Sequence, residues 1–189
     1  MALPFSILLS LFLLLSFSTS STSTKPPKNL VQTSCAQASY PNICLRTLSS
    51  YSGPTNSLRD LAQAAVKVSI SKSHKASDFL TKLKAHNKRE QGALGDCVQQ
   101  MAESVDELTK TLSELQNLRR AGSEFEWHLS NAKTWVSAAL TYEDTCLDGF
   151  KEIDGKIRSD VKMAITNVAK VTSNALYLIN RLDTSSGKN

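Results

Sequence analysis

The sequence predicts an all-α protein: an up-down antiparallel four-helix bundle with an N-terminal helical hairpin that a disulfide closes. Apolar residues recur in steps of three and four along four long segments, as they do on one face of an amphipathic helix. No segment alternates apolar and polar residues in the manner of a half-buried strand. The chain contains four cysteines, an even number that would form two disulfides in a secreted protein.

Residues 1–24 are predicted to be a cleaved secretory signal. They contain no charged side chain, and the apolar stretch over residues 7–17 is too short to span a bilayer. Ser18, Thr19 and Ser20 are small residues that suit a cleavage site. The alternative is a buried N-terminal helix. We expect a secreted protein whose single domain covers residues 25–189 and is not held in a membrane.

The hairpin is predicted over about residues 29–52. Cys35 and Cys44 lie close together in the sequence, and Pro41 between them interrupts any continuous helix. Two short helical turns folded back on each other would allow these cysteines to pair. Gly53 and Pro54 then end the unit.

The bundle is predicted over about residues 57–183, and Ser57 with Asp60 in the following turn marks the start of its first helix. The outer face of this helix and the segment after it is basic. A solvated lysine face explains the pattern, and an acidic polysaccharide is the alternative partner. The net charge of +5 would attract such a polyanion in a salt-dependent way. The basic residues are Lys67, Lys72, Lys75, Lys82, Lys84, Lys88 and Arg89.

The second and third long helices form a second hairpin. Ser123 and Glu126 have the spacing of a capping box, which predicts that the third helix starts there. In an antiparallel pair, residues at equal height have numbers with a constant sum, and the turn near residue 121 places Cys97 beside Cys146. That leaves Cys35 to pair with Cys44. The predicted stripe residues are Leu94, Cys97, Met101, Val105, Leu108, Leu112 and Leu115, followed by Phe125, Leu129, Ala132, Val136, Ala139, Cys146 and Phe150.

Three further features of the bundle need an interpretation. Glu143 occupies a stripe position that should be apolar, and Tyr142 beside it is the expected substitute. Trp127 and Trp135 flank the stripe, where they would pack at its edge or serve as interface anchors. The fourth helix is expected over residues 159–182, after an irregular connection from Asp148 to Asp160.

Catalytic and metal chemistry find no support in the sequence. No histidine lies near a serine or cysteine in a strand-turn-helix context, and no glycine-rich phosphate loop is present. The cysteine spacings and the scattered histidines exclude a zinc site. We therefore predict no enzyme activity, no cofactor and no metal, and we expect no nucleic-acid partner for a secreted chain.

One stretch resembles plant pectin methylesterase inhibitors and the pro-regions of pectin methylesterases: Thr-Trp-Val-Ser-Ala-Ala-Leu-Thr-Tyr-Glu-Asp-Thr-Cys-Leu-Asp-Gly-Phe, at residues 134–150. The Cys-x8-Cys spacing at residues 35–44 and Leu-Gly-Asp-Cys at residues 94–97 are similar to the family's pattern as well. The resemblance covers about residues 29–182. It implies a four-helix bundle with a helical hairpin and the same disulfide pairing.

Members of the family that these motifs resemble have one of three functions: they inhibit pectin methylesterase, they inhibit invertase, or they precede an esterase as its pro-domain. The chain ends at Asn189 without a catalytic domain, which argues against the pro-domain. Invertase inhibitors of the family carry Pro-Lys-Phe before the third helix, whereas this chain has Ser123, Glu124 and Phe125. The alternative to an inhibitor is a non-inhibitory cell-wall protein that binds acidic pectin through the basic helix.

The resemblance therefore implies a monomeric apoplastic inhibitor that covers the pectin-binding cleft of pectin methylesterase. Family members bind the esterase mainly through the second and third long helices, with some contribution from the fourth. Carried onto this sequence, the contact residues are Tyr142, Glu143, Thr145 and Asp148. Thr145 precedes the bridge cysteine, as a contacting threonine does in those inhibitors.

Overall fold

The computed structural model describes residues 28–118 and 122–186, and within these ranges every regular element is a helix. The predicted signal segment, residues 1–24, lies outside the described residues. The six helices are α1 (Lys28–Cys35), α2 (Pro41–Ser49), α3 (Leu58–Leu80), α4 (Lys88–Asn117), α5 (Ser123–Asp148) and α6 (Lys156–Ser186).

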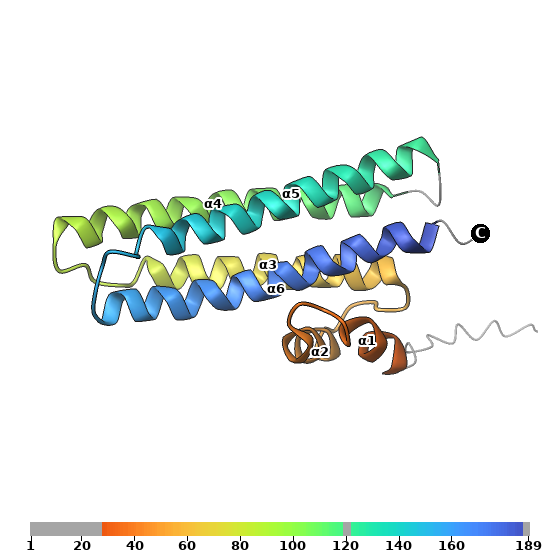
Figure 1. Ribbon diagram of the computed structural model, residues 1–189, viewed down its shortest axis with the longest axis horizontal. Coiled ribbons are helices and arrows are strands. Elements are labelled where there is room, and N and C mark those ends of the chain that lie inside the picture. The colour runs from red at the N-terminus through yellow and green to blue at the C-terminus, as the bar shows by residue number, and fades with distance from the viewer. Residues whose placement is uncertain (1–27, 119–121, 187–189) are drawn as a thin grey trace, which may run out of the picture.

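The four long helices form an antiparallel bundle, which confirms the predicted fold class (Figure 1). Helices α4 and α5 pack as one pair and α3 and α6 as the other, and the two pairs form two layers. The short helices α1 and α2 fold back on each other and lie against α3 and α6 toward one end of the bundle. The α3–α4 and α5–α6 connections lie together at the other end.

Local capping explains where the first two long helices begin. The Ser57 side chain accepts a hydrogen bond from the Asp60 backbone N–H, and the Asp60 carboxylate accepts one from the Ser57 N–H, as in a capping box. Asn87 caps α4 in a similar way through the backbone N–H of Glu90. Both helices therefore start at residues whose side chains satisfy the first backbone donors.

The start of α5 differs from the prediction. Its N-cap is Gly122, which has a φ of 105° and no side chain, so Ser123 is the first helical residue rather than the cap. The Gly122 carbonyl already accepts a hydrogen bond from the Glu126 backbone N–H. Glycine adopts this positive φ without steric strain, and the helix therefore starts one residue earlier than predicted.

The fourth long helix also begins earlier than predicted. Helix α6 starts at Lys156, directly after Gly155 with a φ of 88°, so only residues 149–155 connect α5 to α6. An ion pair between Lys156 and Asp160 lies across this first turn at 2.6 Å. Lys156, Arg158 and Asp160, which the prediction placed in the connection, therefore belong to the first turns of α6.

Two disulfides are present, with the pairing that the hairpin register predicts. Cys97 of α4 and Cys146 of α5 have Cα atoms 4.4 Å apart, and Cys35 and Cys44 have Cα atoms 5.5 Å apart. The first bond ties the two helices of the second hairpin together. The second closes the N-terminal hairpin.

The N-terminal hairpin is held to the bundle by one buried amide as well as by apolar contacts. Asn174 of α6 accepts a hydrogen bond from the Tyr40 backbone N–H at 2.9 Å and donates one to the Tyr40 carbonyl at 3.0 Å. The Asn174 side chain is buried, and the Lys170 ammonium lies over the Tyr40 ring at 5.6 Å from its centroid. These contacts fix where the α1–α2 connection meets the bundle.

The bundle core consists of two apolar clusters. The hairpin-side cluster joins α1 and α2 to one half of the bundle and includes Cys35, Leu61, Leu108, Leu129 and Leu178. The turn-side cluster surrounds the long-range disulfide and includes Leu80, Cys97, Met101, Phe150 and Ile165. A layer of polar residues separates them.

Candidate functional site

Three of the four predicted contact residues share one region of α5. Thr145 and Asp148 are exposed, and Tyr142 is partly buried. The Thr145 hydroxyl donates to the carbonyl of Thr141 at 2.7 Å, and the Asp148 carboxylate pairs with Lys151 at 2.7 Å. Because Thr145 lies next to the disulfide-bonded Cys146, its backbone is tied directly to α4. The region is a rigid polar surface.

The fourth predicted contact residue, Glu143, is not on that surface. Its side chain is completely buried, with an exposed fraction of 0%. The prediction that Glu143 contacts a partner directly is therefore incompatible with this structure. Tyr142 does not replace Glu143 in the core, because the carboxyl group itself occupies the stripe position.

The buried carboxyl group of Glu143 is held by hydroxyl groups from two other helices. Ser104 of α4 and Thr172 of α6 each donate a hydrogen bond to Oε1 of Glu143 at 2.9 Å. The other oxygen, Oε2, is buried and has no hydrogen-bond partner in the described part of the chain. Burial raises the pKa of Glu143 to about 7, although the two hydroxyl donors act in the opposite direction.

These residues belong to a polar layer that crosses the whole bundle. On α4, Ser104 lies between Met101 of the turn-side cluster and Leu108 of the hairpin-side cluster; on α5, Glu143 lies between Ala139 and Cys146 in the same way. Helix α6 contributes Thr172. Helix α3 contributes two buried serines, Ser69 and Ser73, where it passes between the clusters.

The polar layer changes the buried stripe of α4. Ser104 and Thr111 are completely buried, whereas the predicted stripe residues Val105 and Leu112 are only partly buried. The three-and-four spacing therefore predicts the buried face of α4 to within one residue. The hydrogen bond from Ser104 to Glu143 explains why Ser104, and not the neighbouring Val105, lies in the core.

The two tryptophans have different environments. Trp127 is 61% exposed near the start of α5, with its ring edge against His128. His128 in turn contacts the Glu114 carboxylate of α4 at 2.6 Å. Trp135 is partly buried, and the Lys110 ammonium lies 5.1 Å from its ring centroid. Edge packing, the simpler of the two predictions, describes Trp135 but not Trp127.

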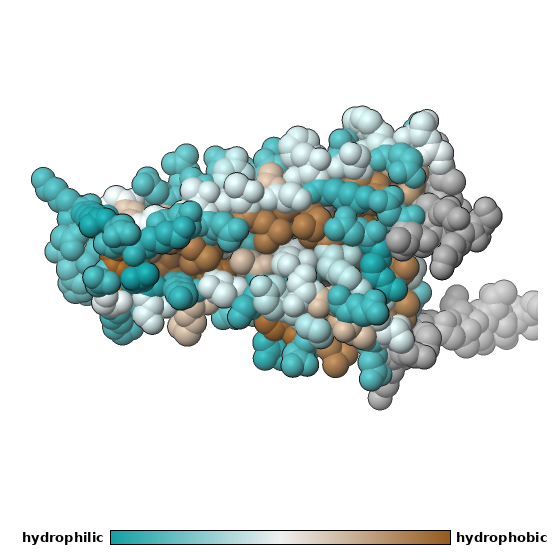
Figure 2. Space-filling model, in the orientation of Figure 1, coloured by the Kyte–Doolittle hydropathy of each residue, from teal (hydrophilic) through white to brown (hydrophobic). Residues whose placement is uncertain are grey.

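The surface of the bundle is mostly hydrophilic on the side that Figure 2 shows, with hydrophobic residues visible in the grooves between helices. Among the described residues, the large hydrophobic side chains that are exposed are Tyr40, Leu45, Trp127 and Met163. They are spread over α2, α5, α6 and the connection before α2. They therefore do not form one apolar contact patch.

The basic face predicted on the first long helix is present on the surface. Lys72 and Lys75 are exposed on α3, and Lys82, Lys84, Lys88 and Arg89 are exposed on the following segment. None of these six side chains forms an ion pair within the described part of the chain. Lys67 is only partly exposed.

Neither a metal centre nor a membrane span is found in residues 28–118 and 122–186. No three acidic, histidine or cysteine side chains there are grouped so that they could hold a metal ion. No helix in these ranges has the length and apolar character needed to cross a bilayer.

Comparison with known proteins places this bundle in a family. The family described as "Plant invertase/pectin methylesterase inhibitor" matches residues 29–178. The chain belongs to this family. The match includes the N-terminal hairpin, the polar layer and most of α6.

Relatives of this inhibitor family include "Pectinesterase inhibitor 3" of Arabidopsis thaliana, which is 52% identical over 169 residues, covering 85% of this chain and 82% of the relative. "21 kDa protein" of Daucus carota is 40% identical over 165 residues, covering 84% and 86% of the two chains. Among solved structures, a mutant form of an Arabidopsis pectin methylesterase inhibitor has the same fold. It aligns with a TM-score of 0.64 and 20% identity, covering 82% of this chain and 97% of its own.

Proposed function

We propose that this protein inhibits pectin methylesterase and so regulates the methylesterification of cell-wall pectin. One observation carries the proposal: 52% identity, over more than four fifths of both chains, to a protein named as a pectinesterase inhibitor. The protein would act as a secreted monomer in the apoplast. It needs no catalytic group, because covering the pectin-binding cleft of the esterase suffices.

The α5 surface around Tyr142, Thr145 and Asp148 is the proposed contact. Binding there orders little, because the disulfide and the helical backbone already hold the side chains in place. Glu143 supports this surface from inside the bundle and makes no contact with the esterase. Affinity would come from a few anchoring side chains on a rigid face.

Invertase is the second target that the family's name includes. The start of α5 argues against it. Invertase inhibitors carry Pro-Lys-Phe there, whereas Ser123 and Glu124 of this chain are exposed helical residues that precede a buried Phe125. In this chain, Ser123 stands where invertase inhibitors have proline, and the acidic Glu124 stands where they have lysine.

Acidic pectin is a second proposed partner. The exposed lysines of α3 and the segment after it form no ion pair with any described residue, which favours an attraction to carboxylate-rich polysaccharide. Such binding would be weak, dependent on salt, and compatible with inhibition, because it uses a different helix.

A titration of the purified protein against three probes tests these proposals. We expect stoichiometric loss of pectin methylesterase activity, no effect on acid invertase, and weak binding to polygalacturonate. Inhibition of invertase alone would overturn the proposed function. Binding to polygalacturonate with no effect on either enzyme would favour a non-inhibitory wall protein.

A further inference from the structure

The two layers of the bundle (Figure 1) differ in charge. Helices α3 and α6 together contain nine lysines and arginines and four acids. Helices α4 and α5 contain four lysines and arginines and eleven acids, of which Glu90, Glu107 and Glu143 are buried. One layer is therefore basic and the other acidic, a division that the net charge of +5 does not reveal.

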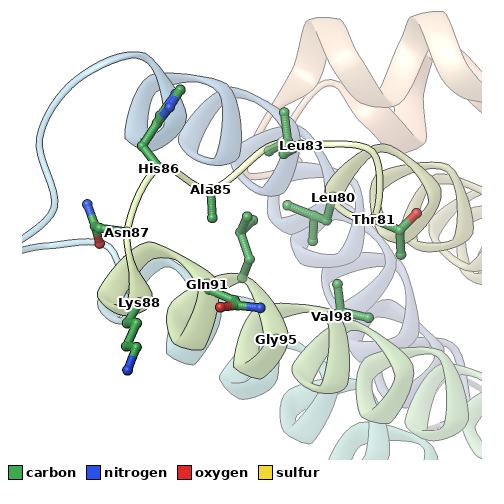
Figure 3. Close-up of a pocket in the computed structure, with 11 residues that line it drawn as sticks. Leu80, Thr81, Leu83, Ala85, His86, Asn87, Lys88, Gln91, Gly95 and Val98 are labelled. Atoms are coloured by element: carbon green, nitrogen blue, oxygen red, sulfur yellow. The ribbon is translucent and has the colours of Figure 1, made fainter.

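The cations of the basic layer continue past the end of α3 over residues 67–84, the basic segment. Figure 3 shows the apolar side chains of Leu80 and Leu83 standing around a hollow between α3, the loop after it and α4. Asp78 is the one exposed acid among residues 67–84. The apolar side chains of the segment therefore turn inward, and its outer surface is cationic. The exposed cations are Lys72, Lys75, Lys82 and Lys84.

The basic segment offers no apolar anchor to a partner. The large hydrophobic side chains that are exposed among the described residues all lie outside it. Ser71, His74 and Thr81, which are exposed between the cations, are polar. Protein interfaces depend on aromatic and apolar anchors, whereas a hydrated, carboxylated polymer is attracted by cations alone. The surface therefore suits an acidic polysaccharide better than an acidic protein.

The α3 part of the basic segment lies at the corner of the bundle opposite to α5. Helix α3 packs against α4 and α6, and α5 packs against the same two helices. Two layers of helices are about 20 Å thick, whereas charges at physiological ionic strength are screened over about 8 Å. The exposed acids Asp144 and Asp148 therefore repel a polyanion from the α5 surface without cancelling its attraction to α3. A polyanion on α3 leaves the proposed esterase contact free.

We propose that one inhibitor binds de-esterified pectin through the basic segment and the esterase through the α5 surface at the same time; this rests on the proposed inhibition of pectin methylesterase. Hydrolysis of a methyl ester by water leaves a carboxylate and releases methanol and a proton, so each turnover adds a negative charge to the polymer. The product of the reaction thus attracts the inhibitor. Binding to an esterase on the same polymer then becomes intramolecular, which raises the effective concentration of the inhibitor where de-esterification has advanced.

The test passes a preformed complex of esterase and inhibitor over immobilised polygalacturonate. Size exclusion without polysaccharide first isolates the complex, and the esterase alone serves as the reference for its own affinity for the matrix. We expect the complex to be retained at low salt, both proteins to elute together, and retention to fall steeply as salt is raised. A matrix of fully methylesterified pectin should retain at least about fivefold less complex, because it lacks carboxylates.

Two double variants with the same net charge provide a matched pair. Lys72→Gln with Lys75→Gln removes two charges from the basic segment and should reduce retention of the complex at least about fivefold. Ser130→Glu with Thr134→Glu makes the same change in net charge at exposed positions of α5 and should leave retention near the wild-type level. Thr134 lies about 16 Å before Thr145 along the helix. Both variants should therefore bind the esterase in solution as tightly as wild type, within about twofold by calorimetry.

The outcomes separate this inference from the proposed function. If no complex forms in the absence of polysaccharide, the proposed inhibition is wrong and simultaneous binding is excluded with it. If the complex forms but is not retained, or if polygalacturonate displaces the esterase from the inhibitor, simultaneous binding alone is wrong. Equal loss of retention in the two double variants would attribute the attraction to net charge and would exclude the basic segment as its site.

Discussion

The Ser104 hydroxyl of α4 donates a hydrogen bond to Oε1 of Glu143 on α5 at 2.9 Å, inside the core of the bundle. Thr172 of α6 donates to the same oxygen at the same distance. Three helices therefore meet at one carboxyl group, between two apolar clusters. The second oxygen, Oε2, has no partner in the described structure, so ionisation of Glu143 would leave charge buried without full compensation.

Glu143→Gln should remove the part of the pH dependence of unfolding that comes from the Glu143 carboxyl group. Burial raises the pKa of Glu143 from its ordinary value of 4.5 to about 7 in the fold. The folded protein thus holds this proton to a higher pH than the unfolded chain, so stability falls as the pH rises from about 4.5 to about 7. We expect the ionisation of Glu143 to lower the free energy of unfolding by about 3 kcal/mol across that pH interval.

Urea unfolding at a series of pH values between 4 and 8 measures the effect. A glutamine side chain at this position cannot ionise, so the difference in unfolding free energy between wild type and variant should change with pH in the stated direction. Glu126→Gln, at an exposed position of the same helix far from Glu143, is the control and should keep the wild-type slope. An unchanged slope in Glu143→Gln would contradict the assignment.

The long-range disulfide should matter more for stability than the short one. The bond between Cys97 and Cys146 closes a sequence separation of 49 residues, whereas that between Cys35 and Cys44 closes one of 9. On the chain-entropy model, the two bonds stabilise by about 4 and about 3 kcal/mol. Thermal unfolding of the two double-serine variants provides the comparison, and the reverse order of stability would refute it.

Asn174→Ala should loosen the N-terminal hairpin while leaving the four long helices folded. The substitution leaves the Tyr40 backbone N–H without its partner and removes one of the two hydrogen bonds to the Tyr40 carbonyl, which still accepts from the Cys44 N–H. The expected cost is about 2 kcal/mol. Hydrogen exchange should become faster across residues 36–48 and stay slow in α4 and α5. Asn174→Asp keeps an acceptor but loses the donor, so an intermediate effect is expected. Uniformly faster exchange would show that the amide supports the whole bundle.

Thr145→Trp should weaken inhibition of pectin methylesterase at least about tenfold, equivalent to about 1.4 kcal/mol. Thr145 is exposed, and a larger side chain there adds bulk to the proposed contact without removing a core contact. Stability should change by no more than about 0.5 kcal/mol. Circular dichroism and melting must accompany the inhibition assay. A folded variant that inhibits as strongly as wild type would exclude this surface from the contact.

Lys72→Glu combined with Lys75→Glu should reduce retention on de-esterified pectin. Both lysines are exposed on α3 and form no ion pair within residues 28–118 and 122–186. Reversing both changes the formal charge by four units relative to the wild-type +5. Retention of the wild type should also fall steeply as salt is raised. If neither change alters retention, the lysine face is solvated and has no role in pectin binding.

The amino-acid sequence was sufficient for much of the fold. The three-and-four spacing on four segments predicted the long helices, because one buried stripe per helix requires that period. The short turn between α4 and α5 then placed Cys97 opposite Cys146 by helix geometry alone. The start of α3 at Ser57 and Asp60 was predictable because each capping partner lies within one turn of the other.

Only the tertiary structure decided the role of Glu143 and the start of α5. The donors to Glu143 lie 39 and 29 residues away in the chain, on α4 and α6, so the helix that contains Glu143 carries no signal that a carboxyl group belongs in its core. The choice of Gly122 over Ser123 as the N-cap depended on a backbone conformation that spacing does not encode. Helical periodicity determines which face is buried, whereas groups on other helices determine whether a polar residue can be buried there.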